Sequence, residues 1–126
     1  MHRVNIKPLT VNKCWQGKRF KTKDYNNYEK EVLLLLPTLV VPDGNLEIRL
    51  KFGVSSKLSD WDNPIKPFQD ILQKKYGFDD RRIYKAVVEK EIVKKGGEYI
   101  VFEIKELKEH YKNETKLIQQ SRSKQV

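Results

Sequence analysis

The chain has 126 residues and carries 26 Lys or Arg residues against 17 Asp or Glu residues, a formal net charge of +9. This length is typical of one domain, and the lack of a run of about 18 apolar residues excludes a transmembrane helix. A polar N-terminus and a single cysteine, Cys14, indicate a cytoplasmic protein without an internal disulfide. The basic charge favours a nucleic-acid partner, although a Lys-rich surface can also simply keep a small protein in solution.

The opening segment predicts a short strand and then a basic loop. His2–Lys7 can form one strand, and Pro8 ends it because proline lacks an amide for the hydrogen-bond ladder. In residues 9–23, basic side chains are interleaved with Trp15 and Phe20, a pattern that suits contacts with DNA bases and phosphates. Alternatively, the two aromatic residues anchor the loop to the core. The expected DNA-contacting residues of this loop are Lys13, Lys18, Arg19, Lys21 and Lys23.

A helix and a strand follow. The helix is predicted over residues 23–36, with Thr22 as its cap and Pro37 after its end. Aromatic and apolar residues at helical spacing give this helix one buried face: Tyr25, Tyr28, Val32 and either Leu35 or Leu36. Asn45–Val54 alternates apolar and charged residues, which predicts a strand with one buried face.

The C-terminal part predicts a hairpin and a tail. Residues 82–93 and 99–107 have the composition of strands, and Gly96 with Gly97 supplies the turn between them. We therefore expect a small single α+β domain over residues 1–107, with a mixed sheet and two main helices in the order β-α-β-α-β-β. Residues 108–126 form a basic polar tail, expected to be a frayed helix or disordered.

Residues 58–80 are acidic within this basic chain: they contain five aspartates and three lysines. Carboxylates this close repel one another unless a cation neutralises them, and Mg²⁺ prefers oxygen ligands. Asp60 and Asp62 flank Trp61 in extended chain, so both carboxylates can point to one side and share a metal ion. Asp79 or Asp80 can complete such a site. Alternatively, the first pair only caps a helix and the second pair only makes a turn.

A second helix is predicted between Pro64 and Gly77. Its packed face consists of Ile65, Phe68, Ile71, Leu72 and Tyr76. Lys66 and Asp70 are four residues apart on the polar face, which predicts a salt bridge between them. Lys66 can orient a metal-bound water or offset charge that develops on a phosphate.

The spacing of the acidic stretch resembles that of the RusA family of Holliday junction resolvases: Asp60-x-Asp62-Asn63-x-x-Lys66-x-x-x-Asp70-x-Leu72, followed by Gly77-Phe78-Asp79-Asp80-x-x-Ile83. The likeness is most specific over residues 58–83 and looser over the rest of residues 3–107. It implies a Mg²⁺-dependent homodimer that cuts four-way DNA junctions by paired symmetric nicks in recombination and repair. Mn²⁺ is expected to substitute for Mg²⁺ in such an enzyme. No small-molecule cofactor is expected. The resemblance also implies a protein encoded by a bacterium or a prophage.

By position, the resemblance makes Asp60, Asp62 and Asp80 the metal-binding catalytic carboxylates and Lys66 the catalytic lysine. Three further motif residues are expected to support them: Asn63, Asp70 and Asp79. Basic residues beside the acidic stretch complete the expected DNA contacts: Lys57, Arg81 and Arg82. Pro67 within the helix and the basic tail depart from the family pattern.

Two other functions stay open on the sequence. The chain can be a module that binds branched DNA without cutting it, because the basic charge predicts binding as readily as cleavage. It can also be a general metal-dependent nuclease that acts on flaps or duplex ends. Large apolar residues near the acidic stretch or in the basic loop are candidates for a wedge that opens a junction: Leu58, Trp61 and Phe20.

Overall fold

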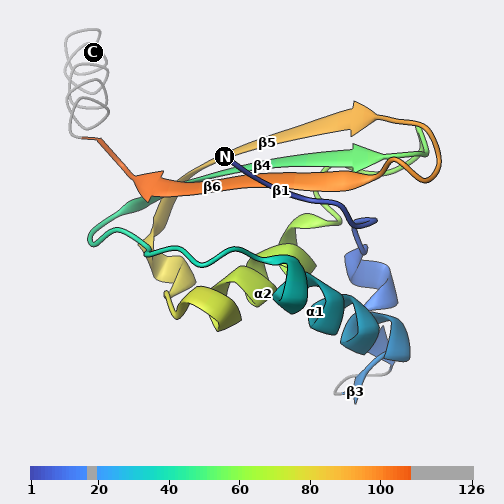
Figure 1. The fold of residues 1–126 in the computed structure, drawn as a ribbon, viewed down its shortest axis with the longest axis horizontal. Coiled ribbons are helices and arrows are strands. Elements are labelled where there is room, and N and C mark those ends of the chain that lie inside the picture. The colour runs from blue at the N-terminus through green and yellow to red at the C-terminus, as the bar shows by residue number, and fades with distance from the viewer. Residues whose placement is uncertain (17–19, 109–126) are drawn as a thin grey trace, which may run out of the picture.

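A mixed four-stranded sheet forms the frame of the molecule (Figure 1). The structure is a computed structural model that describes residues 1–16 and 20–108. The strands lie in the order β1 (His2–Val4), β6 (Tyr99–Glu106), β4 (Leu46–Val54) and β5 (Ile83–Ile92). β4 pairs in parallel with β5 and antiparallel with β6, and β1 pairs antiparallel with β6. The expected small α+β fold with a mixed sheet is confirmed.

The expected hairpin between β5 and β6 is wrong, because β4 lies between these two strands. A turn does form where it was predicted: Gly96 has a φ of +93°, and the amide of Gly97 donates to the carbonyl oxygen of Lys94 at 2.9 Å. The chain crosses the end of β4 here, since the amide of Val93 donates to the carbonyl oxygen of Val54 at 2.8 Å. β4 thus takes the central position, which suits a strand whose alternate side chains are fully buried.

Two helices cover the same face of the sheet, and no described element covers the other face (Figure 1). α1 (Lys23–Leu35) begins as predicted at Thr22, whose hydroxyl accepts a hydrogen bond from the amide of Tyr25 at 3.1 Å. Of the expected stripe on α1, Tyr25, Tyr28, Val32 and Leu36 are buried, whereas Leu35 is 47% exposed. Tyr28, Val32 and Leu36 share one core cluster with the helix-covered face of β4, which carries Leu46, Ile48, Leu50, Phe52 and Val54.

α2 (Ile65–Tyr76) packs as predicted but begins differently. Phe68, Ile71 and Leu72 are fully buried, and Gly77 ends the helix in the left-handed conformation at a φ of +70°. The expected cap by Asp60 or Asp62 is wrong, because Pro64 is the N-cap and no side chain caps this helix. Pro67 is only the third helical residue, where an amide has no acceptor within the helix, so its ring costs no hydrogen bond.

Short elements complete the described chain. The expected loop over residues 9–23 contains a 3₁₀ turn, η1 (Val11–Lys13), and a small ribbon of β2 (Trp15–Gln16) with β3 (Phe20–Lys21). A second 3₁₀ turn, η2 (Asp80–Arg82), leads into β5. Within residues 1–16 and 20–108, no helix has the length and apolar character needed to cross a membrane.

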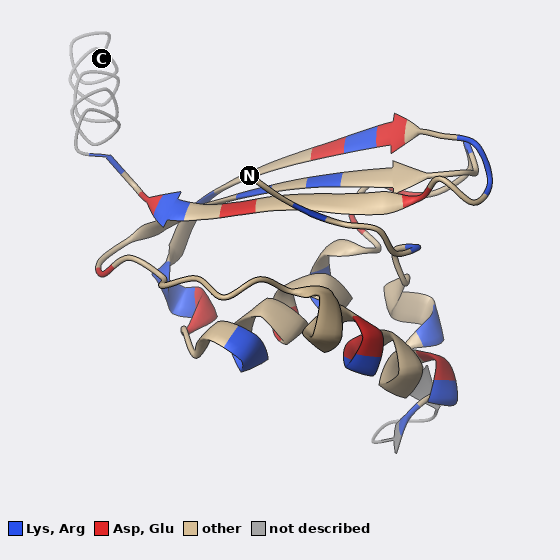
Figure 2. Ribbon diagram, viewed as in Figure 1, with Lys and Arg blue, Asp and Glu red and all other residues tan. Residues whose placement is uncertain are grey.

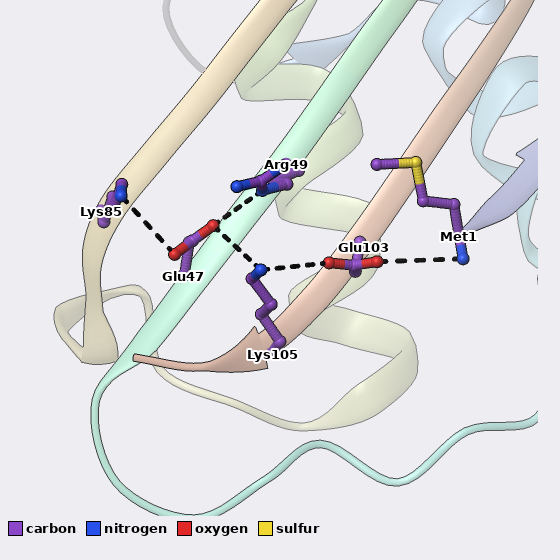
Figure 3. A network of polar contacts seen from close by, with 6 residues as sticks. All are labelled: Met1, Glu47, Arg49, Lys85, Glu103 and Lys105. Carbon is purple, nitrogen blue, oxygen red and sulfur yellow. Dashed lines mark hydrogen bonds and ion pairs between the residues drawn. The ribbon is translucent and has the colours of Figure 1, made fainter. Parts of the chain in front are cut away.

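A network of ion pairs lies on the uncovered face of the sheet (Figure 3). Glu47 on β4 is only 6% exposed, and its carboxylate lies 2.7 Å from Arg49 Nε, 3.5 Å from Lys105 Nζ and 3.8 Å from Lys85 Nζ. Burial opposes ionisation of Glu47, but the hydrogen bond from Arg49 and the surrounding cations outweigh it and lower its pKa.

Candidate metal and DNA site

The segment that joins β4 to α2 carries the first two aspartates of the motif. It is folded on itself, because the amide of Ser59 donates to the carbonyl oxygen of Ser56 at 3.2 Å and the amide of Leu58 donates to Ser56 Oγ at 3.2 Å. Lys90 on β5 fastens it to the sheet by donating to the carbonyl oxygen of Ser59 at 2.8 Å. The aspartates therefore stand on a segment that is tied to β5.

Asn63 links the first aspartate to the start of α2. Its side-chain amide donates to Asp60 Oδ2 at 2.8 Å, and its carbonyl oxygen accepts from the amide of Val11 at 3.0 Å. The carbonyl oxygen of Asp62 accepts from the amide of Ile65 at 3.1 Å, while both aspartate side chains stay exposed. Asn63 thus positions the Asp60 carboxylate, and its supporting part in a metal site stays a prediction.

Lys66 is the second residue of α2 and forms the predicted salt bridge, with Nζ 2.8 Å from Asp70 Oδ1. This hydrogen bond raises the pKa of Lys66, with smaller contributions from the charges of Asp70 and Asp80. Lys66 is therefore cationic at neutral pH. It can neutralise a phosphate or orient a water molecule, but it cannot remove a proton from one.

The two neighbouring aspartates after α2 have different surroundings. Asp79 Oδ1 accepts a hydrogen bond from the amide of Arg81 at 2.9 Å, which caps η2 and lowers the pKa of Asp79. Asp80 is exposed, and its charge acts on Lys66. Capping thus occupies Asp79, whereas Asp80 is electrostatically linked to the candidate lysine.

The carboxylates do not form a complete metal cage. Across residues 1–16 and 20–108, no three His, Cys, Asp or Glu side chains are grouped so that they can hold a metal ion. Mg²⁺, however, is usually held by one or two carboxylates together with substrate phosphates and several waters. The three exposed carboxylates of Asp60, Asp62 and Asp80 are therefore not a preformed site, and a Mg²⁺ held by one or two of them would need phosphate and water oxygens as its further ligands.

The basic residues expected to contact DNA differ in how freely their side chains are available. Lys13, Lys23, Lys57 and Arg81 are exposed, and Lys18 and Arg19 lie outside the described residues. Lys21 Nζ lies 3.5 Å from Glu29 and 4.8 Å from the ring centroid of Tyr25. Arg82 donates to the carbonyl oxygens of Pro42 and Gly44, so it fixes the entry to β4. A contact between Arg82 and DNA stays a prediction, in addition to this structural role.

A cavity of about 720 Å³ opens beside Asp60, between α1 and the segment after β4. Four of its lining side chains are acidic and two are basic: Asp24, Glu31, Asp60 and Glu98, against Lys7 and Lys13. The net negative charge of this cavity would repel a phosphate. Its carboxylates can instead accept hydrogen bonds from a donor such as the amino group of a base. No pattern in the sequence predicted this cavity, because its walls come from four separate segments.

Two large apolar side chains stand in solvent on the same segment as the aspartates. Leu58 is 92% exposed and Trp61 is 58% exposed. The side chain of Phe20, the third candidate for a wedge, lies outside the part that the structure describes. Apolar groups held in water beside charged residues suit contact with unstacked bases.

No protein-family model matches this chain, and no curated protein matches it closely enough to count as a relative. The resemblance to the RusA family therefore stays a prediction from the motif. Lys90 is the residue of the site that sequence reasoning missed. It is 31 positions from Ser59, and nothing in the alternation of β5 indicates that its side chain reaches that far.

Proposed function

We propose that this chain is a Mg²⁺-dependent endonuclease of RusA type, which acts as a homodimer and resolves four-way DNA junctions by paired nicks. The observation that carries the proposal is the position of Lys66. Its ammonium group lies 2.8 Å from Asp70 and within the electrostatic influence of Asp80, directly after the segment that presents Asp60 and Asp62. A fixed cation beside several exposed carboxylates suits a site that binds both a metal ion and a phosphate.

Each residue of the site has a definite part in this proposal. When bound, Mg²⁺ activates water for attack on the phosphodiester and supplies positive charge at the phosphate. Asp60, Asp62 and Asp80 supply the oxygen ligands, and Asn63 holds Asp60 in its orientation. Lys66 offsets negative charge that develops on the scissile phosphate, and Asp70 keeps its ammonium group in place.

A second candidate function is binding of branched DNA without cleavage. It is favoured by the lack of a three-ligand metal group among residues 1–16 and 20–108. The net charge of +9 supports binding in either case. The exposed Leu58 and Trp61 suit the unstacked centre of a junction for both functions.

Cleavage of a synthetic four-way junction distinguishes the candidates. With Mg²⁺ or Mn²⁺ we expect paired symmetric nicks, which EDTA abolishes, and slower cutting of flap and linear duplex DNA. Asp62→Asn should lower the cleavage rate at least about a hundredfold and leave junction binding in place, because it removes a ligand charge from the site.

Asp43→Asn is the matched control, since Asp43 is an exposed aspartate in the turn before β4, outside the acidic stretch. This variant should cut as fast as the parent. Equal cutting of junction and linear duplex would support a general nuclease instead. Tight junction binding without cleavage under any divalent ion, or full activity of Asp62→Asn, would rule out the proposed resolvase.

A further inference from the structure

β5 presents a long strand edge with which no other described strand pairs. It stands at one end of the sheet order and is ten residues long, whereas the opposite end is formed by the three residues of β1. The amides and carbonyls along such an edge can pair with a further strand. A long open edge is therefore either protected by charges or used for assembly.

The side chains of β5 are charged in the middle and apolar near both ends. Tyr84 is 64% exposed and Ile92 is 43% exposed, so two large apolar groups stand in solvent eight positions apart on one strand. Between them lie two lysines and two glutamates: Lys85, Glu89, Lys90 and Glu91. When this order is reversed, Tyr84 comes opposite Ile92 and Lys85 comes opposite Glu91.

We propose that β5 pairs antiparallel with β5 of a second copy of this chain, about a two-fold axis at Val88. Residues whose numbers add to twice 88 then face each other. Tyr84 faces Ile92 of the second copy, and Lys85 faces Glu91 of the second copy. Cross-strand aromatic–aliphatic and opposite-charge pairs both stabilise a sheet, and the symmetry forms each pair twice.

The neighbouring registers are less favourable. With the axis at Val87, Tyr84 faces Lys90, and Ile92 lies opposite Arg82, beyond the end of the strand. With the axis at Glu89, that carboxylate faces its own copy, and like charges directly opposite destabilise a strand pair. The axis at Val88 is the one that covers both exposed apolar side chains with each other.

This pairing uses only the edge of β5, so it does not depend on the proposed nuclease activity. Its register can be read by disulfide formation. In an antiparallel pair the Cα atoms of directly opposed residues lie about 4.5–5.5 Å apart, within the range that a disulfide spans. Val88→Cys should therefore give an oxidised dimer on a non-reducing gel, and buried Cys14 should not compete.

Val87→Cys is the matched control. In the proposed register residue 87 faces Glu89 of the second copy, so two cysteines at 87 are diagonal neighbours and should crosslink poorly. Faster crosslinking at 87 than at 88 would overturn the register. Val88 packs partly against the core, so a second test uses exposed side chains alone.

That test measures mass in solution by light scattering. The parent should be a dimer, and Tyr84→Lys and Ile92→Lys should each raise the dimer dissociation constant about tenfold with unchanged circular dichroism. A monomeric parent, or a dimer that both lysine variants leave intact, would overturn the proposal. A dimer that crosslinks at residue 88 yet cuts no junction would instead overturn the nuclease and leave this interface standing.

Discussion

Lys66 and Asp70 form a pair in which the carboxylate determines what the ammonium group can do. Their contact spans one turn of α2, at 2.8 Å, with Lys66 on the exposed surface of the helix. Because the hydrogen bond raises the pKa of Lys66, the lysine stays charged beyond the pH range in which nucleases act. In the proposed site, Asp70 would therefore position a permanent cation.

Asp70→Asn tests this relation. We expect the pKa of Lys66 to fall toward its ordinary value of 10.5, because the hydrogen bond and the nearby charge that raise it are weakened. NMR titration of the Lys66 side chain measures this shift without any activity assay. In the junction assay, kcat should fall about tenfold with little change in KM, because the lysine keeps its charge and loses its orientation. An unchanged Lys66 pKa would contradict the proposed positioning.

Glu47 gives a pH-dependent prediction on the other face of the sheet. Its folded-state pKa is lowered, so its stabilising effect is present above its ordinary pKa of 4.5 and is lost as the pH falls through the folded-state value. Glu47→Gln should lower the free energy of unfolding by about 2 kcal/mol at pH 7, because it leaves three cations without their shared anion.

Urea denaturation at several pH values measures this difference, which should shrink as the pH falls below 4.5 and the parent carboxylate becomes protonated. Glu89→Gln is the control, since Glu89 is exposed on β5 and should change stability by less than about 0.5 kcal/mol. A Glu47→Gln deficit that stays constant with pH would show that packing, rather than charge, explains the effect.

Between neighbouring strands, Gly53 of β4 lies directly against the ring of Tyr99 on β6. A Cβ placed on Gly53 would lie 2.3 Å from Cε1 of Tyr99, far inside van der Waals contact. The Tyr99 ring cannot move away easily, because its hydroxyl donates to Glu91 Oε2 at 2.6 Å and Arg3 stacks on it at 4.0 Å. Gly53 therefore serves close packing of its strand against Tyr99.

Gly53→Ala should cost about 2 kcal/mol of stability, because the added methyl group must displace the Tyr99 ring. Thermal or urea denaturation measures the loss. In a Tyr99→Ala background the same substitution should cost much less, which a double-mutant cycle reveals as a coupling between the two positions. If Gly53→Ala lowers the free energy of unfolding equally in both backgrounds, the clash with Tyr99 does not explain its effect.

Local sequence patterns predicted most helices and strands, whereas they did not predict contacts between segments that are distant in the sequence. Alternation identified β4, and helical spacing with Thr22 and Gly77 identified both helices, because each signal lies within one element. Alternation does not reveal which strands become neighbours, so the place of β4 between β5 and β6 was missed. The candidate site shows the same limit: the Lys66–Asp70 pair was predictable within one helix, but the contact of Lys90 with Ser59 was not.

At the scale of the molecule, the charged residues among 1–16 and 20–108 are distributed along several elements rather than confined to one of them. Basic and acidic segments alternate along the strands and α1, while the turn between β5 and β6 is basic (Figure 2). Several cations are also engaged within the fold, as Lys74 is with Glu29 at 2.6 Å. The count of 26 Lys and Arg residues thus overstates the number of cationic side chains that are available to a polyanion.

Salt dependence measures how many cations reach DNA phosphates. If about six of them do, the dissociation constant for a four-way junction should rise about a thousandfold between roughly 50 and 200 mM salt. Arg81→Ala should reduce the slope of the logarithmic plot by about one, because its side chain is 90% exposed. Arg82→Ala should instead lower stability, since its guanidinium group holds the carbonyls before β4. A salt-independent affinity would argue against phosphate binding altogether.

The one-sided placement of α1 and α2 has a consequence for the spacing of two cuts. In the proposed dimer, the two-fold axis at Val88 is perpendicular to the plane of the extended sheet. The helices of both copies therefore lie on the same face of this sheet. With a strand separation of about 4.8 Å and a rise of about 3.3 Å per residue, the C-terminal ends of the two β4 strands would stand about 30 Å apart. The aspartate segments begin at these ends. A rigid sheet, rather than a linker, would then fix the distance between the phosphates that the two copies address.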